Sequence, residues 1–410
     1  MARTMPAEQS RGTGDGTELP MVEDRASQAE LGIRRGTAGA KRATILLCGP
    51  PASAVGGGPT HIRNMLASPL AQKFDLVHFE SGSRGTESPA KDEPTAAKVI
   101  RLVTSPFMLM LRIVRLWPKV VHINSTLDHK AFWRDCVYLL VCKLFGRKVV
   151  FQLHGGSLEL LCANGVVRQI VRAAFSLPDA VVLLASVELQ QFAEQLGMRH
   201  RLSIITNAVD VSEYDDPAER PHSGRVRQLG FLARLIRTKG VFEAIQAVEV
   251  LHGEQQFADL ELRIAGSGPE FEEIERFIEE RGLAHCVKMV GPIYGRAKVH
   301  FLRQIDVLLL PTYHEGLPYT ILESLAAGAP VVTTKVGGIP DVVIDGVHGI
   351  LIDSHEATAI AQALRKLAES PEKLQKMSKD CREWAFQRLG LDRLAQRFGE
   401  LYARVSGPAQ

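Results

Sequence analysis

The 410-residue sequence predicts an α/β protein made of two doubly wound domains, each a parallel sheet with helices on both faces. Three observations support this prediction. Short aliphatic runs alternate with longer helical stretches, the runs are apolar on both faces, and a polar segment interrupts the alternation near the middle. Strands that are apolar on both faces are typical of buried parallel sheets. Ligands bind beyond the carboxyl ends of such strands, so we expect a site in the cleft between the two domains.

The first half contains six short runs rich in β-branched and aliphatic residues. We predict strands over residues 43–48, 75–79, 119–123, 148–153, 180–184 and 203–206, with helices over 60–70, 131–145, 164–175 and 186–196. Residues 1–41, which precede these runs, are rich in Gly, Thr, Ser and Glu and have almost no aromatic side chains. Such a segment cannot bury enough apolar surface to offset its loss of conformational entropy, so we expect a disordered tail.

The second half repeats the pattern after a turn-rich interruption. The stretch VSEYDDPAERPHSGR is polar and contains two prolines, which predicts a linker at 213–226. Six further strands are expected over 226–232, 260–265, 286–290, 306–310, 330–334 and 349–352. The predicted domains are therefore 42–212 and 227–385, and a last helix in 386–410 is expected to pack back on the first domain.

Composition and charge exclude several classes of protein. Hydrophobic residues make up 45% and charged residues 23%, close to globular averages, which excludes a collagen-like, wholly disordered or polytopic membrane chain. The net charge of +3 hides an asymmetry, because residues 43–210 carry 18 basic and 12 acidic residues, whereas residues 211–410 carry 24 and 28. The six cysteines form no Cys-x-x-Cys pair, so we expect free, buried thiols. Because no apolar leader or bilayer-length apolar stretch is visible, we expect a cytoplasmic protein, soluble or peripheral to a membrane.

The most specific motif follows the fourth predicted strand of the second half. Glu315 lies in the loop at its carboxyl end, and residues 319–327 should form a helix that carries Glu323. The start of this helix near Gly316 and Leu317 presents free N–H groups and the positive end of a dipole, which suit a phosphate. Glu323 can then reach a ribose attached to that phosphate, and Glu315 can accept hydrogen bonds from the group beyond it.

Other candidate residues of the second half follow neighbouring strands. Arg234 and Lys239 lie in GFLARLIRTKG, where a planar guanidinium and a compact ammonium suit phosphate, although solvated basic residues are the commoner case. Gly266, in AGSGP, could belong to a dinucleotide fingerprint, but the third glycine of that motif is absent. Gly337, in VGGIPD, allows close backbone approach, and a plain turn explains it equally well.

The first half offers weaker signals. Gly57 and Gly58 belong to a glycine-rich loop between the first strand and its helix, and such loops expose backbone N–H groups. His154 follows the fourth strand, which places it at the carboxyl end and toward the cleft, although a lone histidine is more often structural. Asn207 precedes the linker and is expected to shape the hinge.

Together these motifs resemble those of the retaining nucleotide-sugar glycosyltransferases of family 4, which have the GT-B fold of two Rossmann-like domains. The resemblance covers most of residues 43–405 and is carried by the Glu-x7-Glu spacing of Glu315 and Glu323 and by the Arg-x4-Lys-Gly element of Arg234 and Lys239. It implies that Glu315 lies by the donor sugar and that Glu323 binds the nucleotide ribose. It also implies that Arg234 and Lys239 neutralise the donor diphosphate.

The resemblance extends to the weaker motifs. It implies that Gly266 lies near the base, that Gly337 lies near the donor, and that the loop of Gly57 and Gly58 closes against the donor phosphate and the acceptor. It places His154 near the reactive face of the sugar. The chain departs slightly from the family at Ala208, where glycine is usual after the asparagine. The first domain would take the acceptor, and four polar residues after its third strand are candidates for that side: Asn124, Asp128, His129 and Lys130.

The function implied is transfer of a hexosyl group from a nucleoside diphosphate sugar to a hydroxyl acceptor with retention of configuration. Front-face attack, with the leaving phosphate taking the acceptor proton, is the expected mechanism, so we assign no nucleophile. The resemblance implies a UDP-sugar donor first and a GDP-sugar next. It implies a saccharide or lipid-linked saccharide acceptor in bacterial surface polysaccharide or glycolipid assembly. We expect no nucleic acid partner and no cofactor. We also expect no metal, because Asp215 and Asp216 lie in the linker, where solvated carboxylates are the rule.

Three alternatives remain open at this stage. A catalytically silent sugar-nucleotide-binding scaffold would keep the motifs without turnover. A nucleotide-sugar epimerase or a phosphorylase would share the fold, although no pyridoxal lysine or separate phosphate site can be placed for the latter. A dehydrogenase with a dinucleotide-binding domain is disfavoured by the incomplete glycine fingerprint.

Basic residues surround an apolar run in the first half. The run is 107–111, Trp117 follows it, and the five basic residues are Lys98, Arg101, Arg112, Arg115 and Lys119. This pattern predicts docking to an anionic membrane surface. A buried helix with basic side chains reaching out from its ends explains the same pattern.

Overall fold

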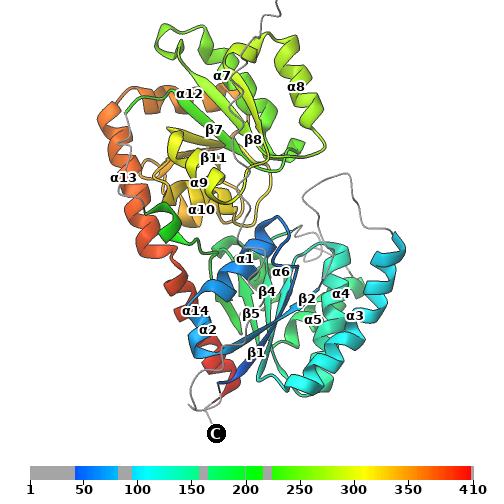
Figure 1. Ribbon diagram of the computed structural model, residues 1–410. Helices are drawn as coiled ribbons and strands as arrows, with labels where there is room; N and C mark the ends of the chain where they lie inside the picture. Colours follow the sequence, from blue (N-terminus) through cyan, green and yellow to red (C-terminus); the bar gives the residue numbers. More distant parts are fainter. Residues whose placement is uncertain (1–41, 82–94, 157–164, 199, 216–223, 408–410) are drawn as a thin grey trace, which may run out of the picture. The chain divides into compact units, whose positions relative to one another are not determined.

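The computed structural model describes residues 42–81, 95–156, 165–198, 200–215 and 224–407. The expected tail 1–41, Cys162 and most of the expected linker lie outside these residues. The described chain from Arg42 onward forms one compact unit that contains two six-stranded sheets. Figure 1 shows the two sheets with their covering helices. The predicted fold class, two parallel-sheet α/β domains, is confirmed.

The first sheet has the strand order β2-β1-β3-β4-β5-β6, and all its neighbours are parallel. Its strands are β1 Thr44–Gly49, β2 Asp75–Glu80, β3 Val120–Ser125, β4 Lys148–Leu153, β5 Ala180–Leu183 and β6 Leu202–Ile204. The helices of this domain are α1 Gly57–Ala67, α2 Leu70–Lys73, α3 Thr95–Leu116, α4 His129–Leu144, α5 Gly165–Ser176, α6 Ser186–Leu196 and, from the end of the chain, α14 Leu391–Ser406. A short 3-10 turn, η3 Val211–Tyr214, follows β6.

Both faces of the first sheet are covered, because successive side chains of a strand point to opposite sides. Leu46 and Cys48 of β1 pack in the layer formed by α3, α4, α5 and α6. Ile45 and Leu47 pack in the opposite layer, which α1, α2 and α14 form. This explains why the strands were recognisable from continuous apolar runs.

The second sheet has the order β12-β11-β10-β7-β8-β9 and is also parallel. Its strands are β7 Gln228–Leu232, β8 Glu261–Ala265, β9 Val287–Gly291, β10 Val307–Leu310, β11 Val331–Thr334 and β12 Gly349–Ile352. Its helices are α7 Val241–His252, α8 Phe271–Glu280, α9 Gly295–Gln304, α10 Tyr319–Ala326, α11 Ile339–Val342, α12 Ala357–Ala368 and α13 Pro371–Arg388. Three 3-10 turns complete it: η4 Arg237–Lys239, η5 Gln255–Phe257 and η6 Leu283–His285.

Helix α14 follows the second domain in sequence and packs on the first sheet. Phe398 and Tyr402 are fully buried in the layer that contains Ile45 and Val150. The Tyr402 hydroxyl lies 2.6 Å from Nδ1 of His122 on β3, which ties this helix to the centre of the sheet. Helix α14 therefore supplies part of the first domain's core.

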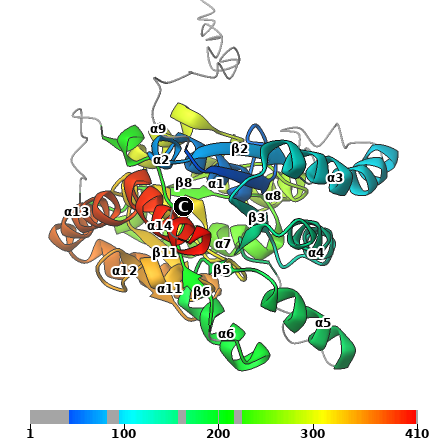
Figure 2. The same ribbon diagram turned by 90° about the horizontal axis from the view of Figure 1, so that it is seen from below.

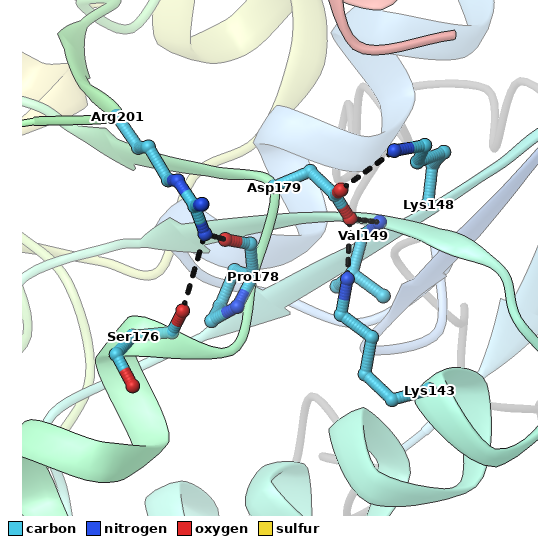
Figure 3. A network of polar contacts seen from close by, with 7 residues as sticks. All are labelled: Lys143, Lys148, Val149, Ser176, Pro178, Asp179 and Arg201. Carbon is cyan, nitrogen blue, oxygen red and sulfur yellow. Dashed lines mark hydrogen bonds and ion pairs between the residues drawn. The ribbon is translucent and has the colours of Figure 1, made fainter.

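A carboxylate lies at the amino ends of β4 and β5 in the first sheet. Asp179, just before β5, accepts from Nζ of Lys143 at 2.5 Å, from Nζ of Lys148 at 3.1 Å and from the N–H of Val149 at 2.9 Å. Figure 3 shows how these donors converge on one side chain, while Arg201 donates to the carbonyls at the end of α5. Burial by itself would raise the pKa of Asp179, but the donors from Lys143, Val149 and Lys148 lower it overall.

The largest difference from the sequence-based prediction is α3. This 22-residue helix was not predicted as an element, and it contains the apolar run 107–111 together with Pro106. Only Leu109 of that run is fully buried, whereas Phe107 is 62% and Leu111 is 59% exposed. The alternative of a buried helix is therefore wrong, since α3 lies at the surface. Across the described chain, no helix is long and apolar enough to cross a bilayer.

Candidate active site

The candidate site is built around the loop between β10 and α10. Glu315 and Gly316 lie in this loop, beyond the carboxyl end of β10, and Leu317 is buried against the second domain's core. Helix α10 begins at Tyr319 with no side-chain cap on its N-terminal amides. Uncapped amides at a helix start are donors that await an acceptor, so this end of α10 suits an anion.

Glu315 forms an ion pair with Lys239, which ends the turn η4 after β7. The two side chains are 13% and 19% exposed, so most of the pair lies away from water. Burial raises the pKa of Glu315, and the neighbouring Lys239 ammonium opposes that rise without cancelling it. Strands β7 and β10 are neighbours in the sheet, and this adjacency brings two residues 76 positions apart into contact.

The second glutamate of the motif has a different partner. Glu323 is buried on α10, and its Oε1 lies 2.5 Å from Nζ of Lys298 on α9. Figure 1 shows α9 and α10 beside each other in the second domain. Lys298 was not predicted, because a lysine in a polar helix looks like any solvated cation. The two glutamates therefore pair with different lysines, Glu315 with Lys239 and Glu323 with Lys298.

Arg234 and Gly266 lie in two loops that touch each other. Arg234 is exposed just after β7, and Arg237, which does not fit the motif, pairs with Glu273. Gly266, after β8, has φ +145, and a Cβ there would lie 2.0 Å from the carbonyl oxygen of Ala233. Only glycine permits this approach, which holds the Arg234 loop against the turn after β8.

Gly337 supports the loop of Glu315 from the next strand. It has φ +55, and a Cβ at this position would lie 1.9 Å from the carbonyl oxygen of Glu315. The N–H of Gly338 donates to the carbonyl of Gly316 at 2.6 Å. The loop after β11 therefore fixes the backbone of Glu315 and Gly316.

We expect Gly337→Ala to destabilise the protein by about 3 kcal/mol or more, because a left-handed backbone and a backbone clash add together. The matched control is Gly346→Ala. Gly346 has φ +74 but open space around the added Cβ, so only about 1–2 kcal/mol is expected. Urea unfolding of both variants measures the difference, and equal losses would contradict the role assigned to the close approach.

Residues of the first domain lie against the same loop. A Cβ on Gly316 would lie 2.9 Å from Cα of Gly155, which follows β4 and His154. Asn207 donates to the carbonyl of Leu317 at 3.1 Å. Gly57, at the start of α1, faces the ring of Tyr319, where an added Cβ would lie 3.6 Å from Cδ2. The glycine-rich loop and the segment after β4 therefore both border the start of α10.

His154 has a defined tautomer. Asn124 on β3 uses its Nδ2 to donate to the carbonyl of Cys48 at 3.1 Å, so its Oδ1 is the atom that faces Nε2 of His154 at 2.9 Å. An amide oxygen only accepts, and therefore Nε2 of His154 carries the hydrogen. Burial lowers the pKa of His154 to about 4, so at neutral pH the ring is uncharged and Nδ1 is an acceptor.

Replacing Asn124 by aspartate tests this assignment. A carboxylate beside Nε2 should raise the pKa of His154 by about 1–3 units, because it favours the imidazolium. Nitrogen-15 NMR of labelled histidine reports both the pKa and the tautomer, with His154 identified by its absence in His154→Gln. A wild-type spectrum with the hydrogen on Nδ1 would contradict the assignment.

Two further histidines lie behind His154. His61 on α1 is fully buried with its ring centre 4.5 Å from that of His154, and His122 is fully buried on β3. Burial lowers the pKa of His61 far below its usual value, and it lowers that of His122 to about 3. Gln152 on β4 is buried in the same cluster. None of these three residues was predicted from the sequence as a neighbour of His154, because they come from different elements.

A cavity of about 170 Å³ opens on the first-domain side. Its lining includes Asn124 and His154 together with Gly58 of the glycine-rich loop and Ala131 and Arg134 of α4. Asp128, one of the candidate acceptor residues, instead accepts from the N–H of Ala131 and caps α4. Lys130 is exposed, and the side chain of His129 is outside the described part.

One group of potential metal ligands meets within the described residues, and it is remote from this site. It comprises His252, His285 and Cys286, with the two Nε2 atoms 2.7 Å apart. Cys286 immediately precedes the amino end of β9, whereas Glu315 follows the carboxyl end of β10. Because the sheet is parallel, the two residues lie at opposite ends of its strands. The expectation that the candidate site works without a metal stays a prediction. Asp215, dismissed as a ligand, pairs with Arg382.

Comparison with known proteins agrees with this geometry. Residues 214–384 match the model of the family "Glycosyl transferases group 1". The chain is 36% identical over 151 residues to a D-inositol 3-phosphate glycosyltransferase of Corynebacterium jeikeium, a match that spans 35% of each chain. It is 26% identical over 352 residues to a GDP-mannose-dependent alpha-(1-6)-phosphatidylinositol monomannoside mannosyltransferase of Mycolicibacterium smegmatis, covering 80% of this chain and 90% of that protein.

Solved structures share the architecture. The sucrose-phosphate synthase of Thermosynechococcus elongatus superposes with a TM-score of 0.69 at 17% identity, over 89% of this chain and 99% of that one. Anabaena HepE in complex with UDP-glucose gives a TM-score of 0.66 at 18% identity, over 88% and 100%. At such identities the likeness establishes the fold, which is that of GT-B glycosyltransferases. Within this fold, the match to the glycosyl transferases group 1 model lies in the second domain.

Proposed function

We propose that the protein transfers a hexosyl group from a nucleoside diphosphate sugar to a hydroxyl of a saccharide acceptor, free or carried by a lipid, with retention of configuration. The observation that carries this proposal is the largely buried Lys239–Glu315 pair beside the uncapped start of α10. The cation and the free backbone N–H groups suit the diphosphate of such a donor, and the carboxylate suits the hydroxyls of its sugar. The relatives named above, whose printed names are those of sugar transferases, support the same class.

In this proposal, charge grows on the departing diphosphate as the bond to the sugar breaks. Arg234, Lys239 and the amides at the start of α10 would stabilise that charge more in the transition state than in the ground state. Lys239 pairs with Glu315, so a phosphate oxygen of the donor would share the ammonium with the carboxylate. Glu323, near Lys298, would accept from the ribose hydroxyls.

The two remaining site residues act on the sugar. Glu315 would accept from its hydroxyls, and the uncharged His154 would accept from a hydroxyl through Nδ1. The leaving phosphate would take the acceptor proton from the same face, so no enzyme nucleophile and no metal are needed. We propose UDP-sugars as donors, then GDP-sugars, and a cytoplasmic reaction at the inner face of the cell membrane in surface polysaccharide or glycolipid assembly.

A thermal-shift screen of UDP-, GDP- and ADP-sugars, followed by assay of the matching donor with saccharide acceptors, tests the proposal. The sharpest variant pair is Arg234→Ala against Arg237→Ala. Arg234 should bind the diphosphate, so its loss should weaken donor binding by about tenfold or more, whereas loss of the surface pair Arg237–Glu273 should change it little.

Each alternative predicts a different result of the same assay. Donor binding without transfer would favour a silent scaffold, and a changed sugar without an acceptor would favour an epimerase. NMR of the anomeric proton in the product reports retention, and full activity in a chelator supports metal independence. If no sugar nucleotide stabilises the protein and none turns over, the proposal is wrong.

A further inference from the structure

Exposed large apolar side chains are concentrated on one flank of the first domain. Of the twenty-four such side chains in the described chain, seventeen lie between Val99 and Leu177, on or next to α3, α4 and α5. A concentration of this kind on one surface marks an interaction site, whereas scattered exposed apolar residues do not.

Helix α3 has an apolar face directed away from the sheet. Ser105, Leu109 and Ile113, four residues apart, are buried against the domain. The opposite side of the helix carries five exposed apolar residues at spacings of three and four: Ile100, Val103, Phe107, Leu111 and Val114. Arg112 and Arg115 are exposed beside this stripe. The helix is therefore apolar on both its inward and its outward side.

Helix α4 repeats the pattern. Four of its exposed side chains are apolar and share one face: Trp133, Val137, Leu140 and Leu144, the last 85% exposed. On α5, Val166, Val167 and Ile170 are exposed. Phe132 of α4 and Phe175 of α5 have ring centres 5.4 Å apart, and α3 packs on α4, so the three helices form one surface. Figure 2 shows α3, α4 and α5 following one another along this flank.

The charge of this three-helix face has one sign. Its helices contain nine Lys and Arg residues and a single acid, Asp135. Asp135 is fully buried and paired with Arg134, so these helices expose no carboxylate among the described side chains. Lys143 is engaged by Asp179, as Figure 3 shows, which leaves Arg112 and Arg115 among the basic side chains at the surface.

We propose that the three-helix face of α3, α4 and α5 docks on an anionic lipid bilayer, with its apolar side chains in the headgroup and upper acyl region. An apolar stripe flanked by Arg, without acids, fits a surface that offers both hydrocarbon and negative charge. A second copy of the chain would bring two faces of the same positive sign together, which opposes a symmetric dimer. Trp117, 58% exposed beside the guanidinium of Arg147, and Trp133 lie on or next to this face, and tryptophan prefers the membrane interface.

The docked face adjoins the acceptor side of the candidate site. Helix α4 presents Leu140 and Leu144 outward, while its first turns contribute Ala131 and Arg134 to the cavity that also contains His154. Docking would therefore hold that cavity close to the headgroup layer. This link to a lipid-carried acceptor rests on the proposed function, whereas docking itself does not.

The test is co-sedimentation of the full chain with vesicles of phosphatidylcholine, with and without phosphatidylglycerol. Binding should be at least about tenfold tighter with the anionic lipid and should weaken as salt rises. Two of the three tryptophans, Trp117 and Trp133, belong to the docking region, while Trp384 lies by His348 in the second domain. Tryptophan emission should therefore shift to the blue on binding, and Trp117→Phe with Trp133→Phe should abolish the shift.

Paired substitutions locate the surface. Phe107→Glu with Leu111→Glu, and separately Leu140→Glu with Leu144→Glu, should lower vesicle binding by about tenfold or more without unfolding the chain, because all four side chains are exposed. The matched control is Val250→Glu with Ile344→Glu, which adds the same charge at exposed apolar positions of the second domain and should leave binding unchanged.

Three results would overturn the proposal. They are absence of binding to anionic vesicles, an equal loss in the control pair, and a wild-type dimer that the face variants convert to a monomer without any effect on vesicles. The thermal shift with sugar nucleotides is measured on the same preparations. Lost docking with retained donor binding leaves the proposed function standing, and retained docking without donor binding leaves the membrane proposal standing.

Discussion

Replacing Glu315 by alanine should lower kcat/KM for the sugar donor about 100- to 10,000-fold. A buried carboxylate that accepts two hydrogen bonds from sugar hydroxyls contributes about 1.5–3 kcal/mol for each bond, and the two together give this range. The change also leaves the largely buried Lys239 ammonium without its partner, so a loss of folding stability is expected beside the kinetic effect, and the kinetics are measured where the variant is fully folded. Steady-state kinetics with the donor from the thermal-shift screen measures the effect.

A control at an exposed ion pair of η4, the turn that also carries Lys239, separates the role of Glu315 from a general loss of charge. Glu273→Ala breaks the ion pair with Arg237, whose two side chains are 62% and 42% exposed. Surface pairs of this kind contribute little, so kcat/KM should change less than about twofold. Unchanged turnover in Glu315→Ala would exclude Glu315 from the reaction, and loss in both variants would point to a wider disturbance of the loops.

Acid should destabilise the protein through the histidines at its centre. His61, His122 and His154 have pKa values lowered by burial, to about 3 for His122 and about 4 for His154. In the unfolded chain each histidine takes up a proton near pH 6.5, whereas in the folded state it stays neutral to a lower pH. Their contribution to stability is therefore complete above pH 6.5 and is lost as the pH falls toward the folded pKa values. Between pH 7 and pH 5 the loss is about 2 kcal/mol for each of His122 and His154, and His61 adds a loss of the same sign.

Urea unfolding at pH 7 and pH 5 measures this loss, and His61→Gln isolates one histidine. The variant should show a pH dependence that is weaker by about 1.4 kcal/mol per pH unit below pH 6. The difference between wild type and variant is the decisive quantity, because four carboxyls have pKa values raised by burial and work in the opposite direction: Asp135, Glu188, Glu213 and Glu315. Parallel curves for the two proteins would show that His61 is charged in the folded state.

The strands could be predicted because each is a short apolar run, and the structure has a strand at each of the twelve predicted places. Motif spacing also predicted that Glu315 and Lys239 bind one ligand, which stays a prediction. Their direct contact could not be predicted, since it depends on β7 lying beside β10, and strand order is not encoded in local periodicity. Lys298 was missed for the same reason, and Asn124 was predicted as an acceptor-side residue but not as the partner of His154. Each gains its meaning from a partner on another element, Glu323 in one case and His154 in the other.

The α3 helix illustrates a different limit. Its apolar residues occur on two opposite sides, so periodicity does not reveal which side packs on the sheet. The run 107–111 includes the buried Leu109 between the exposed Met108 and the half-buried Met110. Which of these side chains is buried depends on where α4 and the sheet lie against the helix. The same ambiguity makes the outward face of α3 visible as a binding surface only in the folded molecule.

Helix α14 determines when the first domain can finish folding during synthesis. Phe398 and Tyr402 fill the layer over Ile45 and Val150, yet they are made after the whole second domain. A ribosome adds about 5–20 residues per second, so the roughly 200 residues from β6 to α14 take about 10–40 s. During that interval α1 and α2 cover this side of the first sheet without α14, so part of its apolar surface stays exposed. A nascent chain stalled before α14 should therefore be a chaperone substrate, although its first sheet is already complete in sequence.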